Sequence, residues 1–152
     1  MIIDEDMSET RLVKSIQRLA SALAKQERQT AAGFGVSVSQ MRILLSLEQA
    51  SGSSRISDLA EEQGLAVSTM TRNLALLEEK GWLRRTPGQE DKRTVRIELS
   101  ESGRDLAAKL SGTNIARFSH AFREFHPSDR VERAVALDRV AAAIESVEPE
   151  KP

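Results

Sequence analysis

The sequence predicts a mainly α-helical fold that carries a small β ribbon of two or three strands. Apolar residues recur at every third or fourth position over most of the 152 residues, which is the spacing of amphipathic helices. Only "TVRIELS", residues 94–100, alternates apolar and polar side chains as a half-buried strand does. A Pro-Gly turn and a charge cluster precede it in "TPGQEDKR". Because a two-stranded ribbon is too small to fold alone, we expect its tip to act outside its own fold.

The first predicted element is a long amphipathic helix from Ser8 to about Ala32, which Gly33 and Gly35 end. A second helix is predicted within "VSVSQMRILLSLEQA", with Ser39 as its N-cap, until "SGSS" ends it near residue 51. The apolar stripe of the first helix consists of Leu12, Val13, Ile16, Leu19, Ala20 and Leu23.

The segment "RISDLAEEQGLAVSTMTRNLALLEEKGW" predicts a helix, a tight turn and a second helix. Ser57 is expected to cap the short first helix, and Gly64 suits the left-handed residue that ends it. Leu65 and Val67 are expected to be buried in the turn. The second helix is expected to stop at Gly81. Its buried side is predicted to consist of Met70, Leu74 and Leu77.

The ribbon and two further helices complete the chain. Strands are predicted over 82–86 and 94–100, with "PGQED" as the loop between them. A helix then starts in "SESGRDLAAKL", Pro127 marks a break, and "SDRVERAVALDRVAAAIESV" forms the last helix. The apolar faces of these elements consist of Val95, Ile97 and Leu99 in the strand, Ile115, Phe118, Phe122 and Phe125 in the first helix, and Leu137, Val140, Ile144 and Val147 in the last.

Four segments result from this pattern: an N-terminal helix over 1–34, the helix-turn-helix with its ribbon over 36–103, C-terminal helices over 104–148 and a tail over 149–152. The stripes of the terminal helices are longer than a core of fewer than ~100 residues can cover. We therefore expect them to mediate a two-fold homodimer. Bundling of these helices within one chain is the alternative.

The composition excludes several classes of protein. The chain has no cysteine, which excludes disulfides and thiolate metal sites. The only two histidines, His120 and His126, are interpreted as helix and helix-end residues, so neither a metal nor another cofactor is expected. No nucleophile–base–acid set or phosphate loop points to an enzyme. With no long apolar run and an acidic N-terminal segment, we expect a cytoplasmic protein without a membrane partner.

The distribution of charge matters more than its sum. The net charge is −1 and the pI about 6.2, yet five basic residues face two acidic ones between Arg84 and Arg96, a local balance of +3. A helix-turn-helix followed directly by a hairpin is a winged helix, whose second helix enters the major groove of DNA while the hairpin tip reaches the backbone or minor groove. Lys92 and Arg93 would extend cationic donors from that tip, and Asp91 would hold Arg93.

The second helix carries side chains suited to the major groove. Ser68, Thr69 and Arg72 project opposite the buried side, with Thr71 and Asn73 on the flanks. An Arg fork can bind O6 and N7 of a guanine, and small hydroxyl residues permit close approach to the duplex. A solvated helix face and a solvated charged hairpin are the alternatives.

The segments "ISDLAEEQGLAVSTMTRNLALLEEKGWLRR" and "EDKRTVRIELSESG" resemble the MarR family of bacterial transcriptional regulators. The wing of that family has Asp, any residue and Arg, followed by a strand that ends in Leu-Ser or Leu-Thr and by a Gly shortly after. The matching residues are Asp91, Arg93, Leu99, Ser100 and Gly103.

The resemblance implies roles for particular residues. Base-edge contacts would come from Ser68, Thr69 and Arg72, with Thr71 and Asn73 as further candidates, while Arg93, held by Asp91, would enter the minor groove. Ser39, Gln40 and Ser57, at helix starts, would bind phosphates through N-terminal amides. Three positions depart from the family pattern: Ala66 stands where a capping Ser, Thr or Asp is common, Ala75 replaces Asp, and Leu76 replaces a polar residue.

The resemblance also implies how such a protein works. A homodimer would bind double-stranded DNA at a pseudo-palindromic operator with half-sites about 10 bp apart. A small-molecule effector, whose identity the sequence does not reveal, would bind in the crevice between helical region and winged helix and relieve repression. The alternative function is a winged-helix interaction or dimerisation module that does not bind DNA.

Overall fold

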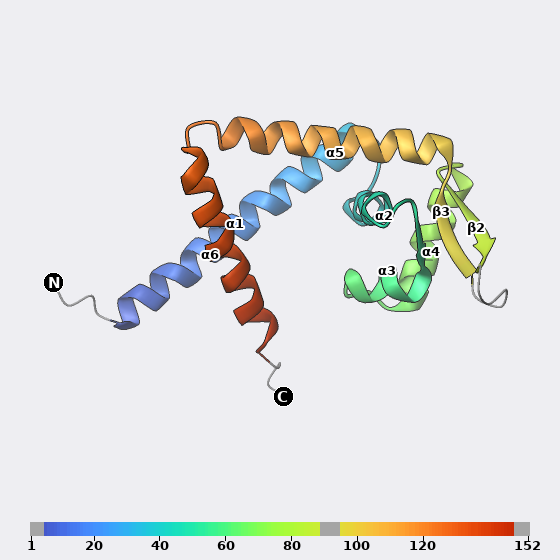
Figure 1. The fold of residues 1–152 in the computed structure, drawn as a ribbon. Helices are drawn as coiled ribbons and strands as arrows, with labels where there is room; N and C mark the ends of the chain where they lie inside the picture. Colours follow the sequence, from blue (N-terminus) through green and yellow to red (C-terminus); the bar gives the residue numbers. More distant parts are fainter. Residues whose placement is uncertain (1–4, 89–94, 148–152) are drawn as a thin grey trace. The chain divides into compact units, whose positions relative to one another are not determined.

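The computed structural model describes residues 5–88 and 95–147, and the side chains from residue 8 onward within them. Two compact units, 1–113 and 114–152, divide the chain and are described separately. The elements are α1 (Glu5–Gly33), α2 (Val38–Gln49), β1 (Ser53–Arg55), α3 (Ile56–Glu62), α4 (Val67–Glu79), β2 (Leu83–Pro87), β3 (Val95–Leu99), α5 (Glu101–Ala121) and α6 (Pro127–Glu145) (Figure 1). The predicted mainly helical fold with a small β wing is confirmed.

The first unit has one apolar core between α2, α3, α4 and the sheet (Figure 1). α1 joins it only near its C-terminal end, through Ala31, and the first turns of α5 close it through Ala107 and Leu110. The largest fully buried side chains are Met41, Ile43, Leu44, Leu47, Leu59, Met70, Leu74, Leu77, Ile97, Leu99 and Leu110, together with Thr30.

The cap of α2 lies two residues before the predicted one. Ser37 is the N-cap: its hydroxyl accepts a hydrogen bond from the Gln40 amide at 3.1 Å. The Gln40 side-chain oxygen in turn accepts from the Ser37 amide at 3.1 Å. The expectation that Ser39 caps this helix was wrong, because Ser37 has the extended backbone that a cap requires and Gln40 stands at the third helical position of a capping box.

The N-cap of α3 also differs from the predicted residue, Ser57. The N-cap residue is Arg55, which makes no side-chain capping bond, and Ser57 already lies inside the helix, where its hydroxyl donates to Asp58 at 3.1 Å. Strand β1 runs directly into α3, so no residue is left for a separate cap. Arg55 Nε instead donates to Asp58 at 2.8 Å across the first turn.

The turn of the helix-turn-helix is largely as expected. Gly64 and Gly81 have φ of +61° and +75°, which confirms both as left-handed residues that end helices. Leu65 is half-buried against the core. Val67 is 55% exposed, so its predicted burial was wrong. As the first residue of α4 it has no preceding helical turn to cover it.

The sheet has three antiparallel strands in the order β1-β3-β2, with Leu83 opposite Leu99 and Ser54 opposite Ile97. Strand β1 was not predicted individually, because three residues of Ser-Ser-Arg show no alternation. Ile97 and Leu99 are buried as expected, whereas Val95 is 45% exposed because the ribbon extends beyond the core at that end.

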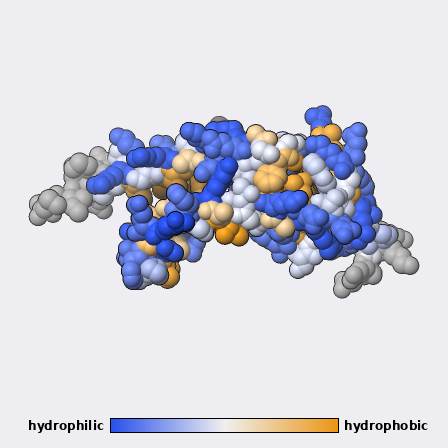
Figure 2. Space-filling view, turned by 90° about the horizontal axis from the view of Figure 1, so that it is seen from above, coloured by the Kyte–Doolittle hydropathy of each residue, from blue (hydrophilic) through white to orange (hydrophobic). Residues whose placement is uncertain are grey.

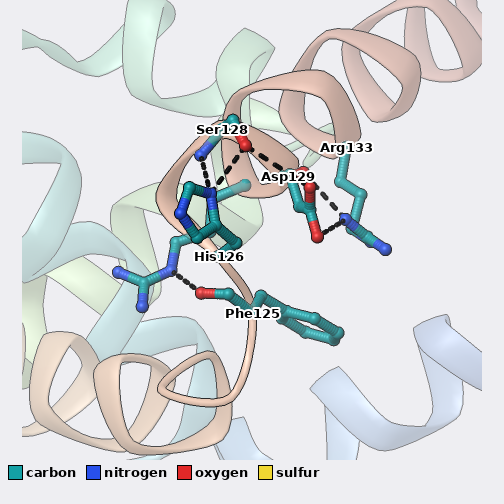
Figure 3. A network of polar contacts seen from close by, with 6 residues as sticks. Phe125, His126, Ser128, Asp129 and Arg133 are labelled. Carbon is teal, nitrogen blue, oxygen red and sulfur yellow. Dashed lines mark hydrogen bonds and ion pairs between the residues drawn. The ribbon is translucent and has the colours of Figure 1, made fainter.

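The second unit contains the end of α5 and helix α6. His126 is the N-cap of α6, with Pro127 at its first position, which confirms His126 as a helix-end residue. Its Nδ1 lies 2.7 Å from the Ser128 hydroxyl, and Arg133 stacks over the Phe125 ring at 4.8 Å (Figure 3). Arg130 Nε donates to the Phe125 carbonyl oxygen at 3.0 Å. The turn between the two helices is therefore held by polar contacts.

No described residue of the second unit is buried. The Phe118 and Phe122 rings stack at 5.9 Å on the surface, and Phe125 follows at 6.0 Å from Phe122. Apolar side chains are visible among hydrophilic ones in the space-filling view (Figure 2). In the described part of the chain, the exposed large apolar residues of the terminal helices and of the short segments that follow α5 and α6 are Leu12, Val13, Leu19, Leu23, Ile115, Phe118, Phe122, Phe125, Val131, Val135, Leu137, Ile144 and Val147.

Neither a membrane-spanning helix nor a cluster of metal ligands is found among the residues that the structure describes. Within 5–88 and 95–147, no helix combines the length and the apolar character needed to cross a bilayer. In the same part of the chain, no three His, Asp or Glu side chains gather where a metal ion could be held.

Candidate nucleic-acid interface

Helix α4 is held by one face and presents the other to solvent. Met70, Leu74 and Leu77 are completely buried against the core. Ser68, Thr69 and Arg72 are exposed on the opposite side, as the helical period predicts. Arg72 forms no ion pair with any residue that the structure describes, so its guanidinium donors face solvent. This face of α4 can enter a groove without disturbing the core.

The two flanking residues are engaged within the protein. The Thr71 hydroxyl donates to the Val67 carbonyl oxygen at 2.8 Å, although the residue is exposed. Asn73 is half-buried, and its Nδ2 donates to the Ser39 hydroxyl at 3.1 Å. The structure thus brings Asn73 and Ser39 together across α4 and α2, a contact that the sequence pattern did not indicate.

The three predicted phosphate contacts fare differently. The backbone amide of Gln40 donates to Ser37 and its side chain is buried in the capping box, so a phosphate contact by this amide would replace its bond to Ser37. Ser39 stays half-buried at the first turn of α2, and Ser57 lies exposed in the first turn of α3. Both keep a position at a helix start.

The start of α4 has no side-chain cap. Ala66 occupies the N-cap position with φ −63° and ψ 142°, and no side-chain hydrogen bond closes the first turn. A capping Ser, Thr or Asp in place of Ala stabilises a helix by about 1 kcal/mol. The departure at Ala66 therefore leaves the amides of the first turn without the usual side-chain acceptor.

The base of the wing is braced by ion pairs. Arg84 and Glu98 stand opposite each other on β2 and β3, with Arg84 Nη2 2.9 Å from the Glu98 carboxylate. Thr86 donates to the same carboxylate at 3.0 Å. Arg85 on β2 pairs with Glu78 of α4 at 3.0 Å, which ties the ribbon to α4. The predicted tip residues Asp91, Lys92 and Arg93 lie outside the described residues.

The Arg84 guanidinium and the Thr86 hydroxyl hold the pKa of Glu98 below its usual value of 4.5. Since the folded pKa is depressed, this stabilisation is present above pH 4.5 and is lost as the pH falls through the folded pKa. As the pH is lowered below 4.5, we expect the free energy of unfolding to decrease less in Glu98→Gln than in the natural protein. Urea titrations at a series of pH values would measure this.

The control for this effect is Glu79→Gln, which removes an exposed carboxylate of α4 that forms no ion pair in the described part of the chain. Its acid profile should follow the natural one. Parallel profiles of all three proteins would contradict a stabilising role for the Arg84–Glu98 pair.

Comparison with known proteins places this arrangement in a family. The model of the MarR family matches residues 36–95, which span α2 to the start of β3. The HTH-type transcriptional regulator YwhA of Bacillus subtilis is 32% identical over 105 residues, 69% of either chain. The chain belongs to the MarR family. The family and its matched relatives are transcriptional regulators and not enzymes, which confirms the function class predicted from the sequence.

Two solved structures share the fold of this MarR-family chain. A MarR family protein from Bacillus stearothermophilus superposes with a TM-score of 0.80 at 18% identity, covering 93% of this chain and 99% of its own. CouR from Rhodococcus jostii RHA1, crystallised with p-coumaroyl-CoA bound, superposes with a TM-score of 0.71 at 20% identity over 83% of this chain and 88% of its own.

The structure explains the MarR motif at the start of α5. The Ser100 hydroxyl donates to the Gly81 carbonyl oxygen at 2.6 Å and accepts from the Gly103 amide at 3.0 Å. Ser102 donates to the same carbonyl oxygen at 3.0 Å. A Cβ atom on Gly103 would lie 2.0 Å from the Trp82 carbonyl oxygen, so only glycine fits. These residues join the end of α4 to α5. The family motif in the sequence pointed to Ser100 and Gly103, whereas no sequence pattern pointed to Ser102.

Proposed function

We propose that this protein is a homodimeric, ligand-responsive repressor that binds a pseudo-palindromic operator. The observation that carries the proposal is the exposed face of α4, where Ser68, Thr69 and Arg72 stand opposite a completely buried side. In a winged helix this face lies in the major groove. Ser68 and Thr69 allow close approach, and Arg72 supplies a fork for a guanine.

The remaining contacts would extend along the backbone and into the minor groove. Arg93, held by Asp91, would enter the minor groove with Lys92 beside it, on the strength of the wing motif in the sequence. Ser39 and Ser57 would face phosphates from the starts of α2 and α3. Thr71 and Asn73 would contribute from the flanks of α4, within the limits set by their internal hydrogen bonds.

The homodimer is supported by apolar surface that a single chain leaves exposed. Phe118, Phe122 and Phe125 form a continuous ring stripe on α5 and the turn after it, and α1 and α6 carry further exposed aliphatic side chains. Such stripes are much larger than the scattered apolar residues of a monomeric surface. A two-fold axis would bury them against their own copy and present two α4 helices to adjacent half-sites.

A small-molecule effector is supported by the fold relationship alone. CouR, which shares the fold, is seen with p-coumaroyl-CoA bound. We propose that an effector of this chain shifts the population between DNA-binding and non-binding states, which requires a different affinity for the two states. Screening compounds for release of bound operator would identify it.

The test of the DNA-binding role is Arg72→Ala, measured on an operator selected from genomic fragments and on a random duplex. Loss of a bidentate base contact should weaken operator binding by about 1 to 3 kcal/mol for each half-site, while binding to random DNA changes much less. The matched control is Arg28→Ala, which removes the same charge from an exposed position of α1 and should change neither affinity. Equal losses on both duplexes would refute base reading by Arg72. Absence of any DNA binding would favour the interaction module.

A further inference from the structure

The exposed face of α4 contains one large apolar side chain that the proposed contacts do not use. Leu76 is 44% exposed, although it lies within a helix whose buried side is complete without it, four residues from the C-terminal end of that helix if the last residue is counted. It also stands where the resemblance leads us to expect a polar residue. In the described part of the chain, the hydrogen bonds and the ion pair of α4 side chains are made by Thr71, Asn73 and Glu78, which do not need Leu76.

The position of Leu76 continues the row of proposed base contacts. Side chains that read the major groove from a helix recur at i, i+3, i+4 and i+7. Starting from Thr69, this spacing selects Arg72, Asn73 and Leu76. Asn73 is half-buried and its side chain donates to Ser39, so Leu76 is the next exposed side chain of this row after Arg72.

The chemistry of leucine restricts what it can recognise. Its side chain has no donor or acceptor, so the base edges it can contact favourably are the apolar ones. In the major groove the only such group is the C5-methyl of thymine. Leu76 lies four positions after Arg72, which corresponds to a rise of about 6 Å along the helix axis. Successive base pairs are about 3.4 Å apart along the duplex axis. The methyl group would then lie about two base pairs from the one that Arg72 contacts.

We propose that Leu76 is a specificity-determining residue that contacts a thymine methyl group about two base pairs from the Arg72 contact in each half-site. This inference rests on the proposed function, since it requires α4 to lie in the major groove. The contact would make the protein prefer A·T or T·A at that position without any hydrogen bond to the base. The contact would also explain why Leu76 stands where the family pattern has a polar residue.

The experiment replaces each thymidine of the selected operator in turn by deoxyuridine, which removes only the methyl group. Burial of one such group is worth ~0.8 kcal/mol, so the natural protein should bind about fourfold more weakly for each half-site changed at one position. The Leu76→Ala dimer loses the contact in both half-sites, so it should bind the thymidine operator more weakly by about fourfold for each half-site. It should no longer distinguish thymidine from deoxyuridine at that position.

Val67→Ala supplies the matched control. Val67 is the other large apolar side chain exposed on α4, and it lies seven residues before Leu74, on the core side of the helix. This variant should keep the fourfold preference for thymidine expected from one buried methyl group. Circular dichroism of all variants would check that the fold is retained.

Three results would overturn the proposal. If the natural protein binds its operator but is indifferent to deoxyuridine at every position, or if Leu76→Ala keeps the preference, Leu76 does not read a methyl group and the proposed function still stands. If genomic selection yields no preferred fragment, sequence-specific binding and the role of Leu76 fail together.

Discussion

Replacing Gly103 with alanine is expected to lower the free energy of unfolding by about 3 kcal/mol, the upper range for inserting a methyl group into a packed site. The new Cβ would lie 2.0 Å from the Trp82 carbonyl oxygen, which is backbone and cannot rotate away like a side chain. That oxygen already accepts a hydrogen bond from the Ser100 amide at 3.0 Å, so moving it would also break the link between β3 and the end of α4.

The matched control lies in the same helix. Gly112 has no atom within 4 Å of an added Cβ, so Gly112→Ala gains helix propensity without a clash. It should raise the free energy of unfolding by up to about 1 kcal/mol. Urea unfolding of the two variants measures the contrast. Equal stability of Gly103→Ala and Gly112→Ala would contradict the packing of α5 against Trp82. A Gly103→Ala protein that fails to fold beside a folded Gly112→Ala would agree with it.

Replacing Phe122 with alanine is expected to raise the dissociation constant of the dimer by about ten- to a hundredfold. Phe122 is the central ring of the stripe, lies between Phe118 and Phe125 at 5.9 and 6.0 Å, and is 45% exposed in the single chain. Full burial of such a side chain contributes about 1.5 to 3 kcal/mol. Because Phe122 is 45% exposed in the single chain, somewhat less than half of this is gained at each copy when the dimer forms. A two-fold interface contains each residue twice, so the loss per dimer doubles.

Sedimentation equilibrium over a range of concentrations measures the dissociation constant. Ser119→Ala, at an exposed position beside the stripe, is the control and should leave the dimer unchanged. Because the two half-sites are bound together only by a dimer, the Phe122→Ala protein should also bind a full operator little better than a half-site. A natural protein that is monomeric at every concentration would refute the dimer. An unchanged dissociation constant in the variant would show that the phenylalanine stripe is not its interface.

The helices could be predicted from the sequence because their signals are local. The spacing of Met70, Leu74 and Leu77 predicts both the existence of α4 and its buried face. Gly64 and Gly81 mark helix ends through a backbone conformation that glycine adopts without strain. The caps were harder. Ser37 and Ser39 are both capping residue types, but only Ser37 is followed three residues later by a Gln that completes a capping box, and this local signal was missed.

The candidate site could be predicted in outline and not in detail. The exposure of Arg72 follows from helical periodicity, whereas the hydrogen bond between Asn73 and Ser39 joins residues 34 apart in the chain. Strand β1 was missed because it has no pattern of its own and exists only through pairing with β3. Val67 and Val95 were assigned to the core by residue type, yet both lie where an element extends past it.

The sequence by itself determined the order of the helices, the glycines that end α3 and α4, and the outward face of α4. Each of these depends on residues within a few turns of one another. Only the tertiary structure decided how these elements are joined. The hydrogen bonds of Ser100 and Ser102 to Gly81, the pair of Arg84 with Glu98 and the third strand all form between distant segments. A pattern of residue types cannot select such partners, because many polar side chains in the chain could pair and only packing brings particular ones within reach.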